Sequence, residues 1–589
     1  MFRPWSNCRC ISALCLLMAC APEDTVRVAD VELRFSGAAS CRPMDPIDLV
    51  VVEALGDFAA SDARTIEILR PSEEPGMIDR FPFDTAALVV RATTRRWEGV
   101  GIRYAIGEST AGPMLLLPLG QDCAIGDPAL ASGGAALVPT PDGGALVVAA
   151  ESQQVLRLGP GETLAQRGNE LSASRLGAAV ALEGEVLIVA GGGVARETFE
   201  VFDIGGARVR SGALTRPRRE ASALGLGGGE VLVLGGRGED DATLAGAEIL
   251  SAADGTSRVA GAMPIRRAGM SLVRTDDGAI LALGGVADGD NPVGDVVAYD
   301  RANDEWELLD SVRLPALPDT SGVALPGGRV AVVASSIPGR SSSMVRVLRR
   351  VPPTLSAIPT LVYDDVLMMN APPLREVRAT ALPDGRLFVS GRDDAGAPRA
   401  FAFDVGRARA EELAMSDTPD AVATLADGVV LSTSPRGASM RRVVARTPFH
   451  QAPATLLADD FALDAEGRFD AAGTTLRALV SDARADLATL RFADFRVEFA
   501  YEGSVELLLR PEGAAPVRVV ANSSEVGPAL CTLPRTPGRL YVQRRGDDVT
   551  LGIGESEQGC RLDGLGERVG VGFRLSEGST LTNVSLVRE

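Results

Sequence analysis

One short phrase recurs along the chain: an apolar strand that runs directly into a pair of glycines. The clear copies are 186–192, 231–236 and 280–285, and weaker copies begin at 145, 330, 387 and 429. Taking the first residue of each strand, the steps are 41, 45, 49, 50, 57 and 42 residues. A repeat of this period, built of strands, is typical of a β-propeller, an architecture that supplies faces for binding and no chemistry of its own.

A second strand precedes each copy, and the turn between the two strands is rich in Asp-Gly or Gly-Gly. Examples are 277–278, 384–385 and 427–428. These dipeptides suit tight hairpin turns, which need residues with positive φ. Seven such hairpins favour seven blades, and the drift of the outer copies from the glycine pair leaves six as the alternative.

Composition restricts the partners and the chemistry. The net charge is −19, from 78 acidic against 59 basic residues, and every basic residue is arginine. An acidic chain of this kind argues against a nucleic-acid partner, since phosphates need clustered cations. The only histidine, His450, lies in a proline-flanked junction, so no site with several histidines can form, and we predict no metal and no cofactor.

The first residues read as an export signal. Arg3 and Arg9 flank a short apolar stretch, 11–18, that ends in Leu17-Met18-Ala19-Cys20. This ending resembles the bacterial lipobox, which implies cleavage of residues 1–19 and a lipid-modified Cys20. The residues after Cys20 are Ala and Pro rather than Asp, which favours the outer membrane, facing either side. An ordinary signal peptide is the alternative.

The cysteines that follow Cys20 agree with export. They form one pair near each end, Cys41 with Cys123 and Cys531 with Cys560, and none lies in the repeats. In an oxidising compartment we expect disulfides Cys41–Cys123 and Cys531–Cys560.

The chain divides into three all-β units after the signal peptide. Residues 20–125 predict a small β-sandwich, 130–447 hold the repeats, and 454–589 show clean apolar–polar alternation, as at Phe495, Val497 and Phe499. Short phrases of the last unit, such as 540–546, resemble a concanavalin or laminin-G-type jelly roll. Such domains bind glycans or serve as spacers.

The fourth repeat makes the family resemblance explicit. Arg267, Gly284-Gly285, Tyr299-Asp300 and Trp306 are similar to the kelch repeat, the propeller family that includes the central domain of galactose oxidase. Arg175 and Arg219 take the place of the family arginine in the second and third repeats. The copper chemistry of galactose oxidase needs two His, two Tyr and a Cys, and the repeats lack the His and the Cys.

The resemblance also implies which face binds a ligand. In a kelch blade, the loop after the glycine pair shares a face with the loops between blades. Those loops are acidic here, and the candidate residues are Asp240, Asp241, Asp288, Asp290 and Asp295. Calcium binding by Asp288, Asp290 and Asp295 is one interpretation, and a solvated loop is the simpler one, since the spacing fits no EF-hand.

We therefore expect a lipid-anchored protein of the bacterial cell envelope that binds or scaffolds a protein or glycan partner without catalysis. The alternatives are a carbohydrate-active hydrolase or lyase that uses carboxylates and arginines, and a purely structural envelope component. With 78 acidic residues, sequence alone singles out no catalytic pair.

Overall fold

The chain is all-β. The computed structural model describes residues 31–588 except 36–40, 46, 57–64, 70–84, 105–111, 119, 126, 132, 163–164, 276–277, 318, 326–327, 336–342, 352–361, 372, 384, 406–408, 444–460, 465–467, 473, 493–494, 512–516, 522–524, 528–532, 535–539, 546–547, 554–555 and 562–568. The helical elements that lie wholly within these residues are two short 3-10 turns, η2 (Pro128–Leu130) and η3 (Asp288–Asp290).

Seven four-stranded antiparallel sheets occupy the middle of the described chain, and we number them 1 to 7. Their strands are β8 (Ala136–Pro139), β9 (Ala145–Ala149), β10 (Gln154–Leu158) and β11 (Gln166–Glu170) in sheet 1; β12 (Ala179–Glu183), β13 (Val186–Ala190), β14 (Thr198–Asp203) and β15 (Arg208–Ala213) in sheet 2; β16 (Ser222–Gly227), β17 (Glu230–Leu234), β18 (Ala247–Ser251) and β19 (Ser257–Ala260) in sheet 3; β20 (Ser271–Arg274), β21 (Ile280–Leu283), β24 (Asp295–Asp300) and β25 (Glu305–Arg313) in sheet 4; β26 (Thr320–Leu325), β27 (Arg329–Ala334), β28 (Ser343–Val351) and β29 (Val362–Ala371) in sheet 5; β30 (Arg375–Ala381), β31 (Leu387–Arg392), β32 (Pro398–Asp404) and β33 (Arg409–Leu413) in sheet 6; and β34 (Ala421–Thr424), β35 (Val429–Ser434), β36 (Gly437–Arg442) and β7 (Cys123–Ile125) in sheet 7. A small hairpin, β22 (Val286–Ala287) with β23 (Asn291–Pro292), is inserted in sheet 4.

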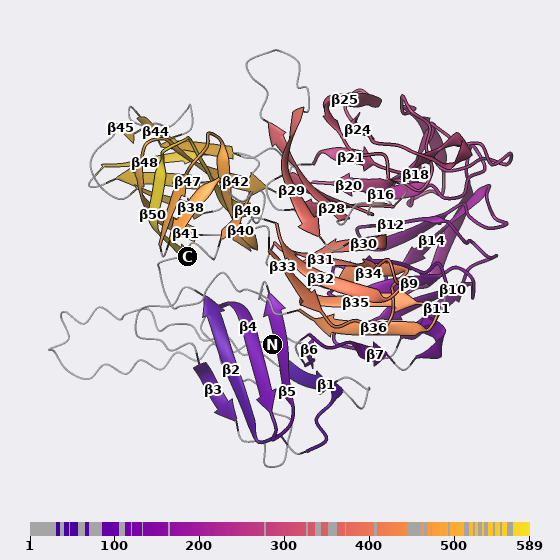
Figure 1. Cartoon of the computed structure of the whole chain (residues 1–589), viewed down its shortest axis with the longest axis horizontal. Helices are drawn as coiled ribbons and strands as arrows, with labels where there is room; N and C mark the ends of the chain where they lie inside the picture. Colours follow the sequence, from indigo (N-terminus) through magenta and orange to yellow (C-terminus); the bar gives the residue numbers. More distant parts are fainter. Residues whose placement is uncertain are drawn as a thin grey trace, which may run out of the picture.

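The sheets close into a ring. The first strand of each sheet contacts the first strand of the next, and β34 of sheet 7 contacts β8 of sheet 1. This propeller-like ring occupies the right-hand part of Figure 1. The repeated strand-plus-glycine phrases form the second strands, such as β13, β17 and β21.

Burial explains why the second strands are so apolar. All residues of β9, β21, β27 and β35 are buried, while the outer strands β11 and β15 are largely exposed. A second strand has a neighbour on each side within its sheet and another sheet against each face, so it reads as a continuous apolar run rather than an alternating one.

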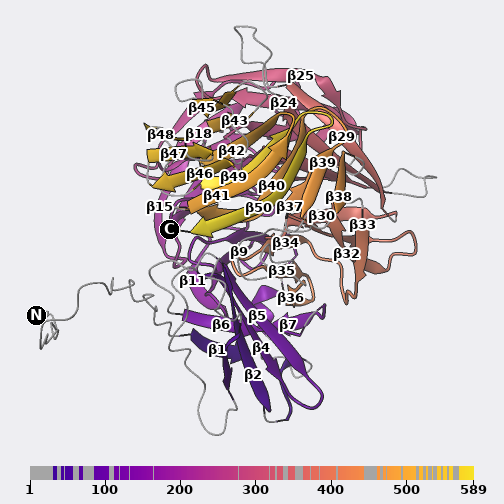
Figure 2. The same ribbon diagram turned by 90° about the vertical axis from the view of Figure 1, so that its left-hand side faces the viewer.

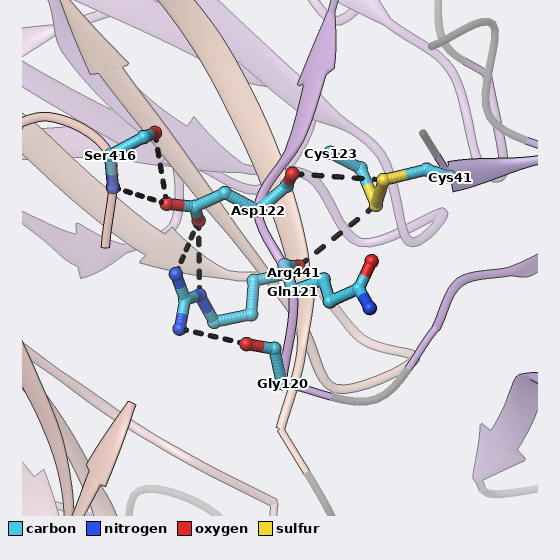
Figure 3. The surroundings of a disulfide bond; sticks show 7 residues. All are labelled: Cys41, Gly120, Gln121, Asp122, Cys123, Ser416 and Arg441. Atoms are coloured by element: carbon cyan, nitrogen blue, oxygen red, sulfur yellow. Dashed lines mark hydrogen bonds and ion pairs between the residues drawn. A yellow bond between two sulfur atoms is a disulfide. The ribbon is translucent and has the colours of Figure 1, made fainter. Parts of the chain in front are cut away.

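The last sheet is completed from the other end of the repeats. The strand β7 precedes sheet 1 in the chain, yet it pairs antiparallel with β36. The predicted disulfide Cys41–Cys123 is present, with Cα atoms 5.6 Å apart, and it fastens β7 to the N-terminal segment (Figure 3). β7 lies in the range predicted for the N-terminal domain but completes a sheet of the ring.

An N-terminal unit and a C-terminal unit flank the ring (Figure 1). The N-terminal unit has a parallel pair, β1 (Val31–Phe35) with β6 (Gly112–Leu116), and a sheet in the order β3 (Thr65–Leu69), β2 (Leu49–Gly56), β4 (Thr85–Thr93), β5 (Glu98–Tyr104). The C-terminal unit has two seven-stranded sheets. One runs β37 (Phe461–Leu463), β40 (Ala483–Phe492), β49 (Val569–Leu575), β42 (Val505–Pro511), β43 (Val517–Ala521), β44 (Glu525–Gly527), β45 (Leu533–Pro534); the other runs β38 (Phe469–Ala472), β39 (Thr475–Ala478), β50 (Thr580–Arg588), β41 (Phe495–Glu502), β46 (Leu540–Arg545), β47 (Asp548–Ile553), β48 (Ser556–Arg561).

The C-terminal unit is a sandwich, because residues of both sheets share one buried apolar cluster, including Phe499 and Phe573 with ring centroids 5.1 Å apart. Val89 of the N-terminal sheet belongs to the same cluster. Toward the ring, buried Arg329 of β27 donates to the carbonyl of Leu463 at 2.9 Å and lies 3.9 Å from Asp486. Figure 2 shows the C-terminal sandwich against one side of the ring and the N-terminal sheet below both.

Candidate binding face of the ring

The glycine pairs bring two sets of loops to one face of the ring. Gly192 and Gly236 have φ of 80° and 95°, and a Cβ on either would lie 2.6 Å from backbone atoms that precede the first strand of the same sheet. Only glycine permits this approach. The residues that follow each pair therefore lie beside the residues that precede a first strand, and the two sets together form the candidate binding face.

A buried arginine donates a hydrogen bond to the first glycine of the pair in sheets 2 and 3. Arg175 donates from Nη1 to the carbonyl of Gly191 at 3.1 Å, and Arg218 donates to the carbonyl of Gly235 at 3.0 Å. The spacing in the sequence predicted that Arg219 binds the glycine pair of sheet 3. That prediction is wrong by one residue, because Arg218 makes the hydrogen bond. The sequence offers two adjacent arginines, and Arg218 is the buried one, at 1% exposure, whereas Arg219 turns outward to the face.

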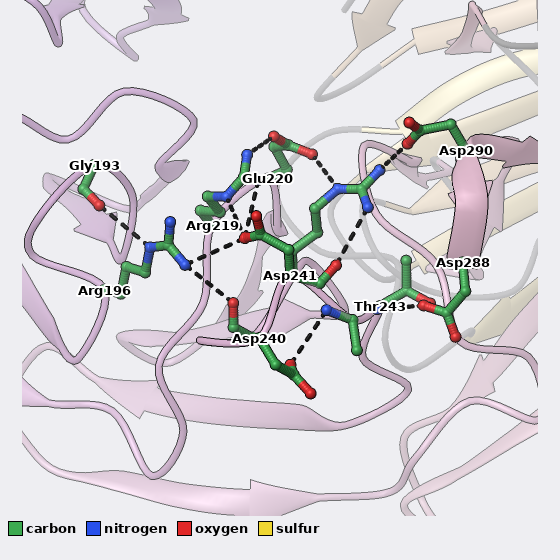
Figure 4. Close-up of polar contacts among 12 residues, drawn as sticks. Gly193, Arg196, Arg219, Glu220, Asp240, Asp241, Thr243, Asp288 and Asp290 are labelled. Carbon is green, nitrogen blue, oxygen red and sulfur yellow. Dashed lines mark hydrogen bonds and ion pairs between the residues drawn. The ribbon is translucent and has the colours of Figure 1, made fainter.

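Arg219 belongs to a charged cluster, the sheet 3 network, made of Arg219, Glu220, Arg237 and Asp241 (Figure 4). Arg237 Nε lies 2.8 Å from Glu220 Oε2, and Arg219 Nη2 lies 3.0 Å from Asp241 Oδ1. Arg219 also pairs with Glu220, which closes the network. Arg196 of the sheet 2 loop reaches the Asp241 carboxylate at 3.4 Å, so the network bridges two sheets.

The five candidate aspartates all lie in this part of the ring, with different partners. Asp241 and Asp290 pair with arginines, Asp290 with Arg237. Asp288 accepts hydrogen bonds from the backbone N–H of Thr243 at 2.7 Å and from its hydroxyl at 2.8 Å. Asp240 accepts from the N–H of Ala242 at 3.2 Å, and Asp295 lies 3.8 Å from Arg313.

The aspartates therefore do not form an acidic surface. Arginines interleave with them, and no group of three or more potential metal ligands was found among the described residues. Hydrogen bonds from Arg219 hold the pKa of Asp241 below its usual range, and those from Thr243 do the same for Asp288. The hydrogen bond to Glu220 raises the pKa of the Arg237 guanidinium. These contacts favour the ionised forms of Asp241 and Asp288.

Sheet 6 carries a second copy of this arrangement, the sheet 6 network: Arg375, Glu376, Arg392 and Asp394. Arg392 Nε lies 2.9 Å from Glu376 Oε2, and Arg375 Nη2 lies 3.0 Å from Asp394 Oδ1. Sheets 3 and 6 lie three positions apart in the ring, so the two networks flank its centre from different sides. Sequence reasoning missed this copy, although the signal was present: Arg-Glu at the start of the first strand and Gly-Arg at the end of the second.

The two glutamates occupy a strained backbone position. Glu220 and Glu376 have φ of 54° and 53°. The corresponding residues of sheets 1, 2 and 4 are Gly134, Gly177 and Gly269, with φ of 64°, 72° and 62°. A side chain in this region costs free energy that glycine avoids. The networks are therefore kept at some cost to stability.

An exposed apolar spot lies beside the sheet 3 network. Val194 is 84% exposed and Leu176 is 48% exposed. The N–H of Gly193 donates to the carbonyl of Leu176 at 2.8 Å, which holds the two residues close together. Arg196, two residues after Val194, links this spot to Asp241 of the network.

The other residues singled out from the sequence do not belong to this face. Cys20, His450 and Cys531 lie outside the described residues. Cys560 is disulfide-bonded, and its pairing with Cys531 stays a prediction. Among the described elements, none is a helix long and apolar enough to span a membrane.

No family model matches the chain, and no curated protein matches it. Solved structures are similar to part of it, and two of them serve as examples. Hydrazine synthase of Kuenenia stuttgartiensis aligns with a TM-score of 0.41 and 12% identity over 53% of this chain and 95% of that chain. The protein YjhT aligns with a TM-score of 0.32 and 12% identity over 45% of this chain and 92% of that chain. At these scores the two alignments carry no argument about function.

Proposed function

We propose that the chain is an exported envelope protein whose ring, a seven-bladed kelch-type propeller, binds a protein partner without catalysis. The binding surface is the face that carries the sheet 3 and sheet 6 networks. The observation that supports this most is the repetition of one charged network at two places where a glycine would cost less. Strain of this kind is common at sites kept for function.

The chemistry of the face favours a protein over other partners. Guanidinium and carboxylate groups alternate, so a complementary surface must carry both charges, as a folded protein does. The Leu176 and Val194 side chains provide apolar contact next to that charged rim, and apolar centres with polar rims are typical of protein interfaces.

The test is capture of envelope proteins by the purified chain and by the variant Arg237→Ala with Arg392→Ala. Each substitution removes the cation that holds a strained glutamate. We expect recovery of the partner, measured by quantitative mass spectrometry, to fall about tenfold or more in the variant. Raising the salt concentration should weaken capture by the wild-type chain, because exposed ion pairs are screened.

The same sheet offers a matched control at the opposite end of its strands. Glu230 begins β17, whose other end runs into Gly235, and it pairs with Arg258 at 3.5 Å and Arg301 at 3.3 Å. Glu230→Ala should capture the partner as well as the wild type does. Equal loss in Glu230→Ala would contradict the assignment of the face, and binding on a glycan array that the double variant loses would move the partner to carbohydrates.

The anchor is part of the same proposal. A lipid on Cys20 would hold the ring at the outer membrane, with several acyl chains giving stable attachment. Mass spectrometry of the mature N-terminus and fractionation of a Cys20→Ala variant test it. Release of that variant into the soluble fraction is the expected result, and unchanged membrane retention would contradict it.

A further inference from the structure

Three sheets place an arginine in the same buried position. Arg175, Arg218 and Arg267 each donate from Nη1 to the first carbonyl of a glycine pair, and for Arg267 the acceptor is Gly284 at 3.2 Å. All three are at most 1% exposed. Because the cost of burying an unpaired charge is high, each guanidinium needs a counter-charge.

Sheets 2 and 3 supply that counter-charge from the third strand. Glu200 lies 2.7 Å from Arg175 Nε, and Glu248 pairs with Arg218. Each glutamate is the register partner of the residue two before the glycine pair: Glu200 faces Val189, and Glu248 faces Val233.

Sheet 4 has no such carboxylate at the corresponding position of its third strand. The residue two before its glycine pair is Ala282, and its register partner is Val297, which is fully buried. Sheet 4 also lacks a backbone N–H group that binds the glutamate in sheets 2 and 3. Ser172 and Thr215 donate from the backbone to Glu200 and Glu248, and the residue at the same spacing before Arg267 is Pro264, which has no N–H.

Arg267 is therefore a buried cation with unused donors. Its Nη1 donates to the carbonyls of Gly284 and Asp295, the latter at 2.9 Å, but Nε and Nη2 have no acceptor among the described residues. No described carboxylate lies within ion-pair distance of Arg267. The Asp295 charge acts on Arg267 from further away and raises its pKa, but the Asp295 carboxylate lies 3.8 Å from Arg313. Burial lowers the pKa of Arg267 to about 10, so the guanidinium is still charged at neutral pH.

We propose that Arg267 binds a monovalent inorganic anion, such as chloride, in the space where sheets 2 and 3 hold a glutamate carboxylate. Valine lacks the carboxylate of glutamate, so at this position no side-chain oxygen of the third strand meets Nε and Nη2. A single negative charge matches the single buried positive charge, whereas phosphate or sulfate would need further donors that Pro264 does not provide. This site is separate from the proposed partner face and does not depend on it.

The site would stabilise the junction of sheets 3 and 4. The Arg267 N–H donates to the carbonyl of Leu244 at 3.1 Å, and the Arg267 carbonyl accepts from the N–H of Gly236 at 3.0 Å. An anion that fixes Arg267 therefore fixes the contact between the two sheets. We expect the ring to gain stability with chloride in a saturable manner.

The first test is thermal unfolding in chloride and in gluconate at constant ionic strength. Chloride at ten times its dissociation constant should raise the melting temperature of the wild type by about 2 °C. Val297→Glu supplies the carboxylate of sheets 2 and 3, so its melting temperature should not depend on chloride. If the melting temperature of the wild type does not depend on chloride, as expected when water fills the site, the proposal is overturned. A chloride effect that persists in Val297→Glu overturns it too.

Bromide makes the test independent of how the variant folds. Crystals of the wild type grown or soaked in bromide should show an anomalous peak within hydrogen-bond distance of the Arg267 guanidinium. Glu248→Val, which imitates sheet 4, should show a second peak beside Arg218. A wild-type crystal with no peak beside Arg267 overturns the proposal, whatever the melting experiment shows.

Discussion

The chain uses the same two groups, guanidinium and carboxylate, in two regions that differ in exposure. Inside sheets 2 and 3, the side chains of Arg175–Glu200 and Arg218–Glu248 are at most 1% exposed. On the face, the carboxylates of Asp241 and Asp290 are 59% and 78% exposed. Buried pairs are costly to break and exposed pairs are screened by water, so the first region holds the fold and the second is free to exchange partners.

Breaking a buried pair should have the largest effect on stability. Glu248→Ala leaves the Arg218 guanidinium buried without its carboxylate, and we expect a loss of about 3–5 kcal/mol in the free energy of unfolding. Chemical denaturation of the variant and the wild type measures it. The double variant Arg218→Met with Glu248→Leu, which removes both charges, should recover part of the loss, and a loss below about 1 kcal/mol in Glu248→Ala would contradict the comparison.

Opening the closure of the ring should have the second largest effect on stability. Asp122, at 12% exposure, pairs with the nearly buried Arg441 at 2.6 Å and accepts from the Ser416 N–H at 3.0 Å, next to the Cys41–Cys123 disulfide (Figure 3). The disulfide spans 82 residues, and a loop of this length gives up to about 4.5 kcal/mol of stability. Cys41→Ser should lose about 2–4 kcal/mol, measured by denaturation without reductant. Cys123→Ser, which removes the same bridge from its other end, should give the same loss, and an unchanged midpoint in both variants would show that β7 is held without the bridge.

Acid should weaken the buried pair of Arg218 with Glu248. Burial opposes ionisation of Glu248, but the Arg218 charge and the Thr215 N–H outweigh it and hold its pKa below the usual range. A carboxyl whose pKa is lower in the folded state stabilises the protein above its unfolded pKa of about 4.3, and this contribution is lost as pH falls further. The difference in unfolding midpoint between the wild type and Glu248→Gln should therefore narrow from about pH 5 to about pH 3. A constant difference over that range would contradict a role for the ionised Glu248.

Sequence predicted the parts of this picture that depend on local pattern. The apolar runs before the glycine pairs became β13, β17 and β21, and the disulfide followed from the placement of Cys41 and Cys123. The strand β7 was not predicted, because three residues carry no periodicity and their partner, β36, lies about three hundred residues away in the chain. The role of Arg218 was given to Arg219, because burial and not spacing separates two adjacent arginines.

The candidate face was predicted only in part. The acidic loops were identified, but not their pairing with arginines, because the pairs join different loops: Arg196 and Arg219 lie 45 and 22 residues before Asp241, and Arg237 pairs with Asp290, 53 residues later. The sheet 6 network was not predicted because the outer repeats have lost the glycine pair. Positive φ at Glu220 and Glu376 was not predicted, because a glutamate gives no sign of it; it shows only when these residues are aligned with Gly134, Gly177 and Gly269 of other sheets.

The smallest expected effect on stability concerns Glu220, whose exposed ion pair contrasts with the buried pair of Glu248. Glu220→Gly removes an exposed ion pair worth up to about 1 kcal/mol and relieves backbone strain of about the same size, so stability should change by less than about 1 kcal/mol. Glu220→Ala loses the pair and keeps the strained φ, so it should be less stable than Glu220→Gly. Denaturation of the two variants under identical conditions measures the difference. If Glu220→Gly cost as much as Glu248→Ala, the face would be part of the structural framework. If it unfolds like the wild type and no longer captures the partner, the glutamate is kept for binding rather than for the fold.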